Sequence, residues 1–191
     1  MEDVNLDFQV IGPSDVGSHL VDVLLAASHR KNVDDRVAAL ELGVLTAALV
    51  DIEVYAMESA CRLLPLARDG DRTEETLAIA DIGATTMTLY VLHGRRSVYT
   101  REQRFGGDRL ITEVQQRYDM DRDEALRQLL GGSLPDCFTT EVLRPFQKTL
   151  AQQIGRALQF FYSTGTRNRV DRVVLAGGPA GIPDIDAQID P

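Results

Sequence analysis

The sequence predicts an α/β protein in which helices pack on a mixed sheet, with a small β-rich segment placed before them. Three observations support this prediction: strand-like apolar runs joined by short turns between residues 77 and 105, helical spacing of apolar residues from 107 to 166, and a late buried-type strand at 172–178. With 191 residues and 44% apolar content, the chain is long enough to bury a core.

The first segment is expected to contain a hairpin and a helix. The runs LDFQVIG (6–12) and HLVDVLLAAS (19–28) are β-rich, and the proline, serine, aspartate and glycine between them are typical of a hairpin connection. Apolar residues at helical spacing follow Asn32, which we expect to cap a helix. A short strand, ALVDIE (48–53), is predicted next.

A second helix and a linker are expected to follow. VYAMESACRLLPLA (54–67) is predicted to be helical, with Pro65 limiting its far end. The polar, glycine-containing stretch from Arg68 to Thr76 is the best candidate for a boundary between two lobes.

The second half of the chain is predicted to hold the sheet and its helices. LAIADIG (77–83), TTMTLYVLHG (85–94) and SVYTREQRF (97–105) are expected to form an antiparallel meander. Helices are expected over 106–119, after Asp121 and over 139–166, and the strand RVVLAGG (172–178) is expected to lead into a final helix. The side chains predicted to form the buried face of the long helix are Leu150, Ile154, Leu158 and Phe161.

Composition and charge exclude several classes of function. Twenty basic against 29 acidic residues give a net charge of −9, which disfavours sequence-independent binding to nucleic acid or anionic lipid. Cys61 and Cys137 form no CxxC pattern or Cys/His cluster, so neither a disulfide framework nor a zinc site is indicated. No apolar run approaches the ~20 residues that span a bilayer, and no signal pattern begins the chain, so we expect a cytoplasmic location.

The corner Asp81-Ile-Gly83 is the first candidate site. Glycine lets backbone N–H groups approach a phosphate, and Thr85 and Thr86 can add hydroxyl donors. Because two anions repel, a carboxylate at this strand end would hold Mg²⁺ beside the phosphates, usually through water. The alternative is an ordinary hairpin in which Asp81 caps the turn.

Two glycine pairs are further candidates. Gly177 and Gly178 end a buried strand, and would let a flat, uncharged ring lie against the backbone; a tight strand-to-helix turn explains them equally well. Gly106 and Gly107 also end a strand, and we expect Asp108 to cap the following helix rather than contact a ligand.

The order of these motifs resembles the second half of the actin and Hsp70 ATPase fold, which is ribonuclease H-like. DIGATTMTLYV looks like its second phosphate loop, VVLAGGPAGIPDIDAQI like its adenosine motif, and VDIEVYAMESACRLL like the helix connecting its two lobes. The resemblance implies ATP and Mg²⁺ as cofactors, Glu53 as a catalytic acid facing the metal and the attacking water, and Asp81 as the metal ligand. The cofactor-binding residues that it implies are Asp81, Gly83, Ala84, Thr85, Thr86, Gly106, Gly107, Asp108, Gly177, Gly178 and Pro179.

Within that superfamily the chain resembles the PilM family of type IV pilus assembly, with the cell-division protein FtsA next. The resemblance implies an inserted 1C-like subdomain over 1–49, a connecting helix of the first lobe over 50–66, and the second lobe over 75–191. It also implies a nucleotide-binding scaffold, cytoplasmic and at the inner-membrane face, that recruits the cytoplasmic N-terminal peptide of PilN and other pilus assembly components. Formation of a homo-oligomer stays open.

Two departures from the family pattern bear on activity. The chain starts after the place of the first phosphate loop and stops just past the adenosine motif, so we expect a partial fold. Because half of the phosphate-binding donors would be missing, we expect weak ATP binding at best. The family member would be at most a weak ATPase, and this truncated chain is expected to be inactive. Three alternatives stay open: an FtsA-like protein, a nucleotide-free interaction module like the cytoplasmic domain of the type II secretion protein GspL, and a sugar or acetate kinase of the same fold.

Overall fold

The computed structural model describes residues 3–63, 75–165 and 169–189, and these fall into two compact units, Met1–Ala56 and Met57–Pro191. The stretch 68–74 of the predicted linker and the predicted helix end at Pro65 lie outside the described residues. No helix among those residues has both the length and the apolar content needed to cross a membrane.

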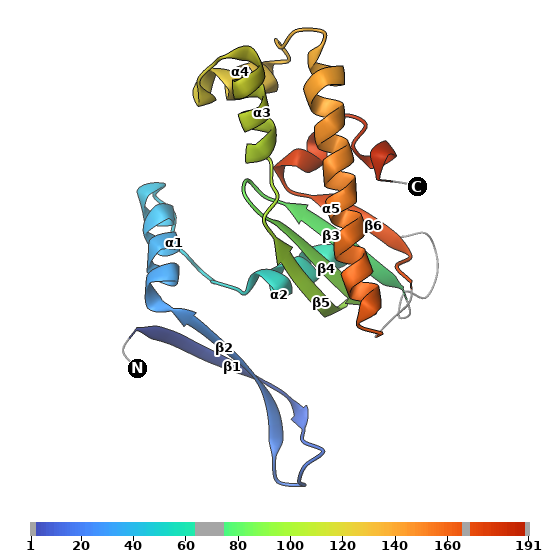
Figure 1. Cartoon of the computed structure of the whole chain (residues 1–191). Helices are drawn as coiled ribbons and strands as arrows, with labels where there is room; N and C mark the ends of the chain where they lie inside the picture. The colour runs from blue at the N-terminus through green and yellow to red at the C-terminus, as the bar shows by residue number, and fades with distance from the viewer. Residues whose placement is uncertain (1–2, 64–74, 166–168, 190–191) are drawn as a thin grey trace. The chain divides into compact units, whose positions relative to one another are not determined.

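The first unit is built on a two-stranded hairpin (Figure 1). β1 (Val4–Pro13) pairs antiparallel with β2 (Val21–His29), and a bulge interrupts the register between Val10 and Gly12. α1 (Arg30–Leu42) follows β2 directly. The hairpin confirms the prediction made from the two β-rich runs.

Two predictions for this unit are wrong. Asn32 does not cap α1, because the helix already begins at Arg30 and places Asn32 inside its first turn. The predicted strand at 48–53 is absent: residues 45–52 have no regular structure, and α2 (Glu53–Leu63) begins at Glu53. A strand needs a neighbour to satisfy its backbone groups, and the sheet of this unit consists of β1 and β2. Leu49, in the middle of the segment, is exposed.

The second unit is centred on a mixed four-stranded sheet in the order β5-β4-β3-β6. β3 (Thr76–Ile82), β4 (Met87–His93) and β5 (Arg96–Gln103) form the predicted antiparallel meander, and β6 (Arg172–Ala176) pairs parallel with β3. Gly94 and Arg95 both have positive φ and close the β4–β5 turn, a backbone shape that suits the twist of a hairpin.

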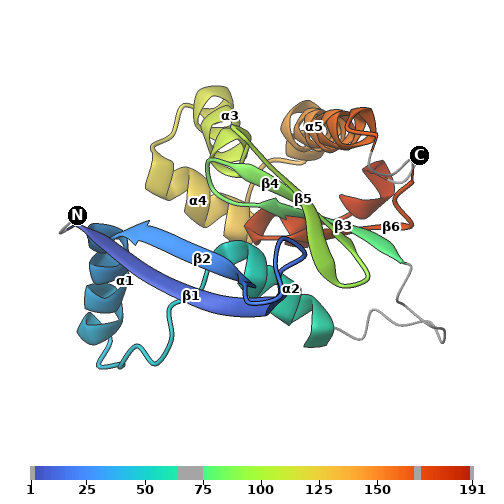
Figure 2. The same ribbon diagram turned by 90° about the horizontal axis from the view of Figure 1, so that it is seen from below.

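Helices cover both faces of this sheet (Figures 1 and 2). α3 (Asp108–Tyr118), α4 (Arg122–Gly131), the π-helical turn η2 (Thr139–Leu143) and α5 (Arg144–Ser163) follow β5. α3 and α5 lie over one face, and the part of α2 from Met57 onward lies against the other. Glu58 fixes that part of α2, because its Oε1 accepts a hydrogen bond of 2.6 Å from the Ser97 backbone N–H.

The core lies between the sheet and α5. Of the predicted stripe, Leu150, Ile154 and Phe161 are fully buried, and Leu158 packs against the same cluster while partly buried. These α5 side chains share one cluster with apolar side chains of β3 and β4. The strand residues in the cluster are Ala78, Ala80, Ile82, Met87, Leu89 and Val91. Asp121 caps α4 as expected, since its Oδ1 accepts from the Glu124 N–H at 2.8 Å.

Two predictions for the second unit need correction. Gly107, not Asp108, is the N-cap of α3, and Asp108 instead pairs with Arg122 at 2.7 Å. The predicted final helix is replaced by two single 3₁₀ turns, η3 (Gly178–Gly181) and η4 (Asp186–Gln188). Pro183 explains the break, because proline disfavours a helical residue before it, and Ile182 is extended, with ψ of 129°.

Candidate functional site

Three glycine-containing loops meet where β3 and β6 end. The two strands run parallel, with Asp81 beside Ala176 in register, so the residues that follow them leave the sheet at the same edge. These residues are the corner Gly83–Thr86 and the segment Gly177–Gly181. In open α/β sheets this is the edge at which ligands bind.

The third loop, Gly106–Gly107, packs on the first. Gly107 N–H donates to the Gly83 carbonyl at 2.9 Å, and Asp108 N–H donates to the Ala84 carbonyl at 2.8 Å. The first loop closes on itself through Gly83 N–H and the Thr86 carbonyl, also at 2.9 Å. A Cβ at Gly106 would lie 2.2 Å from the Ala84 carbonyl oxygen, so this contact requires glycine.

Gly177 packs the end of β6 against the end of β3. Its φ is +86°, and a Cβ there would lie 2.2 Å from the Ile82 carbonyl oxygen and 2.9 Å from Asp81 Oδ1. The Asp81 carboxylate therefore stands at the junction of the loops. Glycine at 177 is explained by the fold alone, as the tight-turn interpretation proposed.

Gly178 differs from its neighbour. Its φ is not positive, and a Cβ there would have no heavy atom of the protein within 4 Å. It lines a cavity of about 1210 Å³, so the space beyond its Cα is open. Because neither backbone conformation nor internal packing requires glycine at 178, the residue fits a site where a ligand lies against the backbone.

The cavity is lined both by the glycine loops and by apolar side chains. Gln147, which is nearly fully buried, donates to the Pro183 carbonyl at 2.8 Å and fixes the segment after η3 to α5. A cavity of this size exceeds the 300–1,000 Å³ typical of small-molecule sites. The apolar side chains that line it from α3 to the end of η2 are Leu110, Ile111, Leu126, Leu129, Leu130, Phe138 and Leu143.

The structure brings together most, not all, of the residues predicted for the site. The predicted residues that line the cavity are Gly83, Ala84, Gly107, Asp108, Gly177, Gly178 and Pro179. Asp81, Thr85, Thr86 and Gly106 lie in or beside the same loops without lining it. Glu53 belongs to the first unit, whereas every lining residue belongs to the second. Its predicted catalytic role stays a prediction.

The charges at the cavity are partly neutralised within the protein. Asp108 is paired with Arg122, and Arg144 at the start of α5 adds a cation to the lining. Across the part of the chain that the structure describes, no three His, Cys, Asp or Glu side chains are grouped to hold a metal ion. A metal here would need ligands from a bound molecule beside the carboxylates of Asp81, at the junction of the loops, and of Asp108 and Asp184, which line the cavity.

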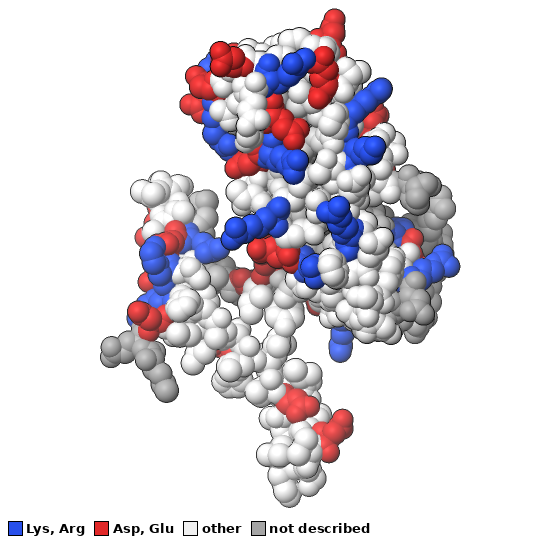
Figure 3. Space-filling model, viewed as in Figure 1, with Lys and Arg blue, Asp and Glu red and all other residues white. Residues whose placement is uncertain are grey.

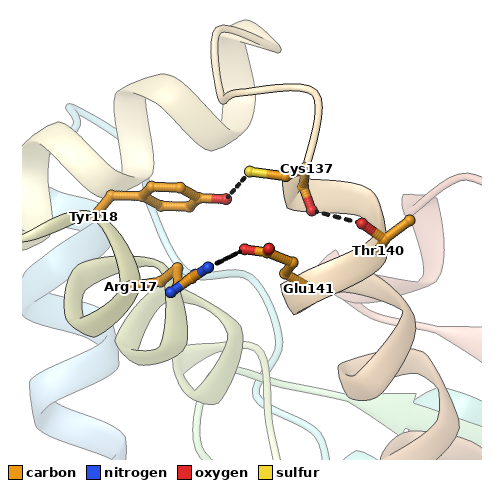
Figure 4. A network of polar contacts seen from close by, with 5 residues as sticks. All are labelled: Arg117, Tyr118, Cys137, Thr140 and Glu141. Carbon is orange, nitrogen blue, oxygen red and sulfur yellow. Dashed lines mark hydrogen bonds and ion pairs between the residues drawn. The ribbon is translucent and has the colours of Figure 1, made fainter.

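A polar network that sequence reasoning missed fixes one wall of the cavity (Figure 4). Arg117 at the end of α3 forms an ion pair with Glu141 of η2, and the Tyr118 hydroxyl lies 3.8 Å from Cys137 Sγ. Thr140 Oγ1 donates to the Cys137 carbonyl at 3.0 Å. Partial desolvation and the Cys137 hydrogen bond raise the pKa of Tyr118, and Glu141 raises the pKa of Arg117. The network links α3 to η2, whose Thr139 lines the cavity.

Comparison with known proteins places this geometry in a family. The family model described as type IV pilus assembly protein PilM matches residues 1–191. The solved structure of a PilM-PilN type IV pilus biogenesis complex matches with a TM-score of 0.67 and 20% identity, over 97% of this chain and 53% of that chain. The chain therefore spans about half the length of that relative.

Two more distant structures also match. An archaeal actin homologue has a TM-score of 0.49 and 19% identity, over 64% of this chain and 42% of its own. The ethanolamine utilization protein EutJ from Carboxydothermus hydrogenoformans has a TM-score of 0.48 and 18% identity, over 61% of this chain and 40% of its own. The family model and the match to the PilM-PilN complex support the actin-like α/β fold that the sequence predicted.

Proposed function

The chain belongs to the PilM family of type IV pilus assembly proteins, and from this premise we propose that it is an actin-like scaffold that binds nucleotide and recruits the cytoplasmic tail of PilN. It would act on the cytoplasmic side of the inner membrane, where PilN presents that tail. The observation that carries the nucleotide part is the cavity at the three glycine loops, and above all the open space in front of Gly178.

The lining of the cavity suits both parts of a nucleotide. A base needs an apolar wall, and the helices α3 and α4 with η2 supply one. Phosphates need backbone N–H donors and close approach, and the glycine-containing loops at Gly83 and Gly178 line the same cavity. Asp81, at the junction of these loops, would hold Mg²⁺ through water, and the metal would offset the phosphate charge.

The proposed partner site is an apolar face of the hairpin in the first unit. Leu6 pairs with Ala27, Phe8 with Leu25 and Val10 with Val23, which puts these side chains on one face. Phe8 and Leu25 are 66% and 64% exposed, and the hairpin is mostly white in Figure 3. A two-stranded hairpin is marginal alone in water, so a partner segment covering this face would stabilise it.

The charge of this hairpin restricts the partner. Residues 1–29 contain five acidic side chains and no lysine or arginine. A tail that carries lysine or arginine beside its apolar residues complements the charge of such a face, and cytoplasmic segments next to a membrane span have an excess of Lys and Arg. The related solved structure is a complex of PilM with PilN.

Saturation-transfer NMR with millimolar Mg-ATP tests the nucleotide part, because the method detects weak binding. We expect transfer to the adenine protons with the unaltered chain and its loss with Gly178→Val, which fills the open space. Gly155→Ala is the matched control, since Gly155 on α5 also faces open space but does not line the cavity. Equal signals from all three proteins would contradict the assignment.

Fluorescence anisotropy with a labelled PilN N-terminal peptide tests the partner part. Phe8→Asp should abolish binding, and Val16→Asp, at an exposed position in the hairpin loop, should not. A second candidate is the same scaffold without nucleotide, which Ala84 favours because its Cβ restricts the loop that would approach phosphate. Peptide binding that is unchanged in Asp81→Ala, together with no transfer from Mg-ATP, would support that candidate.

A further inference from the structure

The outer edge of β5 is an open sheet edge. β5 is the end strand in the order β5-β4-β3-β6, and among the described residues no strand lies on its outer side. In an antiparallel pair, alternate residues turn their N–H and C=O groups away from the neighbouring strand, so the edge offers unpaired donors and acceptors. Glu58 takes the first of these positions, the Ser97 N–H, and the Gln103 carbonyl accepts from the Phe105 N–H at 2.9 Å. Between them, Val98–Glu102 is paired on its outer side with no strand among the described residues, and Val98 is the bulge residue of the β4–β5 register.

This edge is basic in an acidic protein. The stretch from 95 to 104 contains four arginines and one acidic residue, whereas the whole chain has a net charge of −9. The four arginines are Arg95, Arg96, Arg101 and Arg104. In the described ranges, none of their side chains forms an ion pair. Figure 3 shows basic side chains over the middle of the second unit, where β5 and α5 lie.

Arg101 is held in position by an aromatic ring. Its guanidinium lies 3.8 Å from the centroid of the Phe160 ring, and its buried Nε has no hydrogen-bond partner among the described residues. Stacking on an aromatic face fixes the plane of a guanidinium, which is the geometry used to bind a carboxylate with two parallel hydrogen bonds. Phe160 itself is 49% exposed, so an apolar surface adjoins the charge.

We propose that the β5 edge accepts an extended acidic segment of a partner protein as an additional strand of the sheet. Backbone hydrogen bonds to β5 would supply the pairing, and a Glu or Asp opposite Arg101 would supply the acceptor that its guanidinium lacks. Directly opposed residues have Cβ atoms about 4.5–5.5 Å apart, within reach of an Arg–carboxylate pair. This interaction is additional to the nucleotide and PilN binding proposed above.

Charge decides between an acidic partner and a second copy of this chain. Two β5 edges that paired with each other would bring arginines against arginines, and like charges directly opposed destabilise a sheet. The open stretch Val98–Glu102 has room for a strand of roughly 16 Å at ~3.3 Å per residue. A short acidic peptide with alternating side chains therefore matches the edge in length, charge and backbone pattern.

The probe is a fluorescein-labelled heptapeptide, Val-Glu-Val-Glu-Val-Glu-Val, with its Lys counterpart as a control, titrated by anisotropy against the full chain at low salt. We expect the Glu peptide to bind at least tenfold more tightly than the Lys peptide. Arg101→Glu should weaken Glu-peptide binding at least tenfold. Arg127→Glu on α4 makes the same change in net charge away from the edge and should alter the affinity less than twofold.

Three outcomes would overturn the proposal. Equal losses with Arg101→Glu and Arg127→Glu would mean non-specific attraction. Binding without slower amide exchange in Val98–Glu102 would exclude strand addition. No binding at all would mean that the arginines only keep this edge from pairing with another copy. If Arg101→Glu does not fold, the exposed Arg104→Glu replaces it, with the same expected loss.

Discussion

Gly177 packs against the backbone of Ile82 so closely that a Cβ on Gly177 would stand 2.2 Å from the Ile82 carbonyl oxygen and 2.7 Å from its carbonyl carbon. The contact joins the end of β6 to the end of β3, the two parallel strands that carry the site. The position of the glycine loops around the cavity therefore depends on the absence of a side chain at 177.

Gly177→Ala should destabilise the second unit by more than about 2 kcal/mol. With φ of +86° and ψ of 177°, this backbone conformation costs a non-glycine residue about 1–3 kcal/mol, and the Ile82 peptide must move as well. Urea unfolding followed by circular dichroism measures the effect, since the chain has no tryptophan. Gly178→Ala is the control one residue away: it meets open space and should change the free energy of unfolding little. Similar losses in both variants would contradict this account.

Phe146→Ala should destabilise the second unit by about 3–5 kcal/mol. Phe146 is fully buried on α5, and its ring stacks on Phe105 with the centroids 5.5 Å apart. Its removal leaves a cavity between α5 and the loop after β5. Phe160→Ala, on the same helix but half exposed, is the matched control and should cost much less in the same urea titration. A cost for Phe160→Ala equal to that for Phe146→Ala would show that burial does not set the difference.

The elements that the sequence predicted are those with a strong local signal. β3 and β4 read as apolar runs because both of their faces are buried, and Ile154 and Phe161 repeat at the spacing of a buried helix face. The errors lie at helix ends and in short segments. Asp108 looked like a cap because it precedes a helix, but Arg122, fourteen residues away, takes its carboxylate.

The candidate site could be predicted only in part, since it depends on contacts between distant segments. The sequence named the glycine loops, but it could not separate Gly177, which the fold needs, from Gly178, which it does not. It also missed the ion pair of Arg117 with Glu141, twenty-four residues apart, because no local spacing brings these side chains together.

Gly155→Ala should stabilise the second unit by up to about 1 kcal/mol. Gly155 lies inside α5, where glycine costs roughly this amount relative to alanine, and a Cβ there meets no atom within 4 Å. The midpoint of thermal unfolding should rise accordingly. Gly107→Ala, whose Cβ would lie 3.0 Å from Pro179 Cγ, should not raise it. A lower midpoint for Gly155→Ala would mean that another group occupies the space beside this turn.

The two cysteines should differ in their reactivity with Ellman's reagent. Cys137 is exposed, whereas Cys61 on α2 is partly buried and burial raises the pKa of its thiol. The thiolate is the reactive form, so the raised pKa leaves a smaller fraction of Cys61 than of an unperturbed thiol able to react at pH 8. The reagent also has more restricted access to Cys61 because its side chain is partly buried. We expect the Cys137→Ser variant, which keeps Cys61, to react more slowly than the Cys61→Ser variant.

The pH dependence separates the two causes of slow reaction at Cys61. A raised pKa means that the thiolate fraction keeps increasing through the alkaline range, so the rate in Cys137→Ser should still rise steeply above pH 9. Restricted access alone would lower the rate equally at every pH and leave the profile of an ordinary thiol. A rate for Cys61 that equals that of Cys137 at pH 8 would contradict both the burial of Cys61 and the direction of its pKa shift.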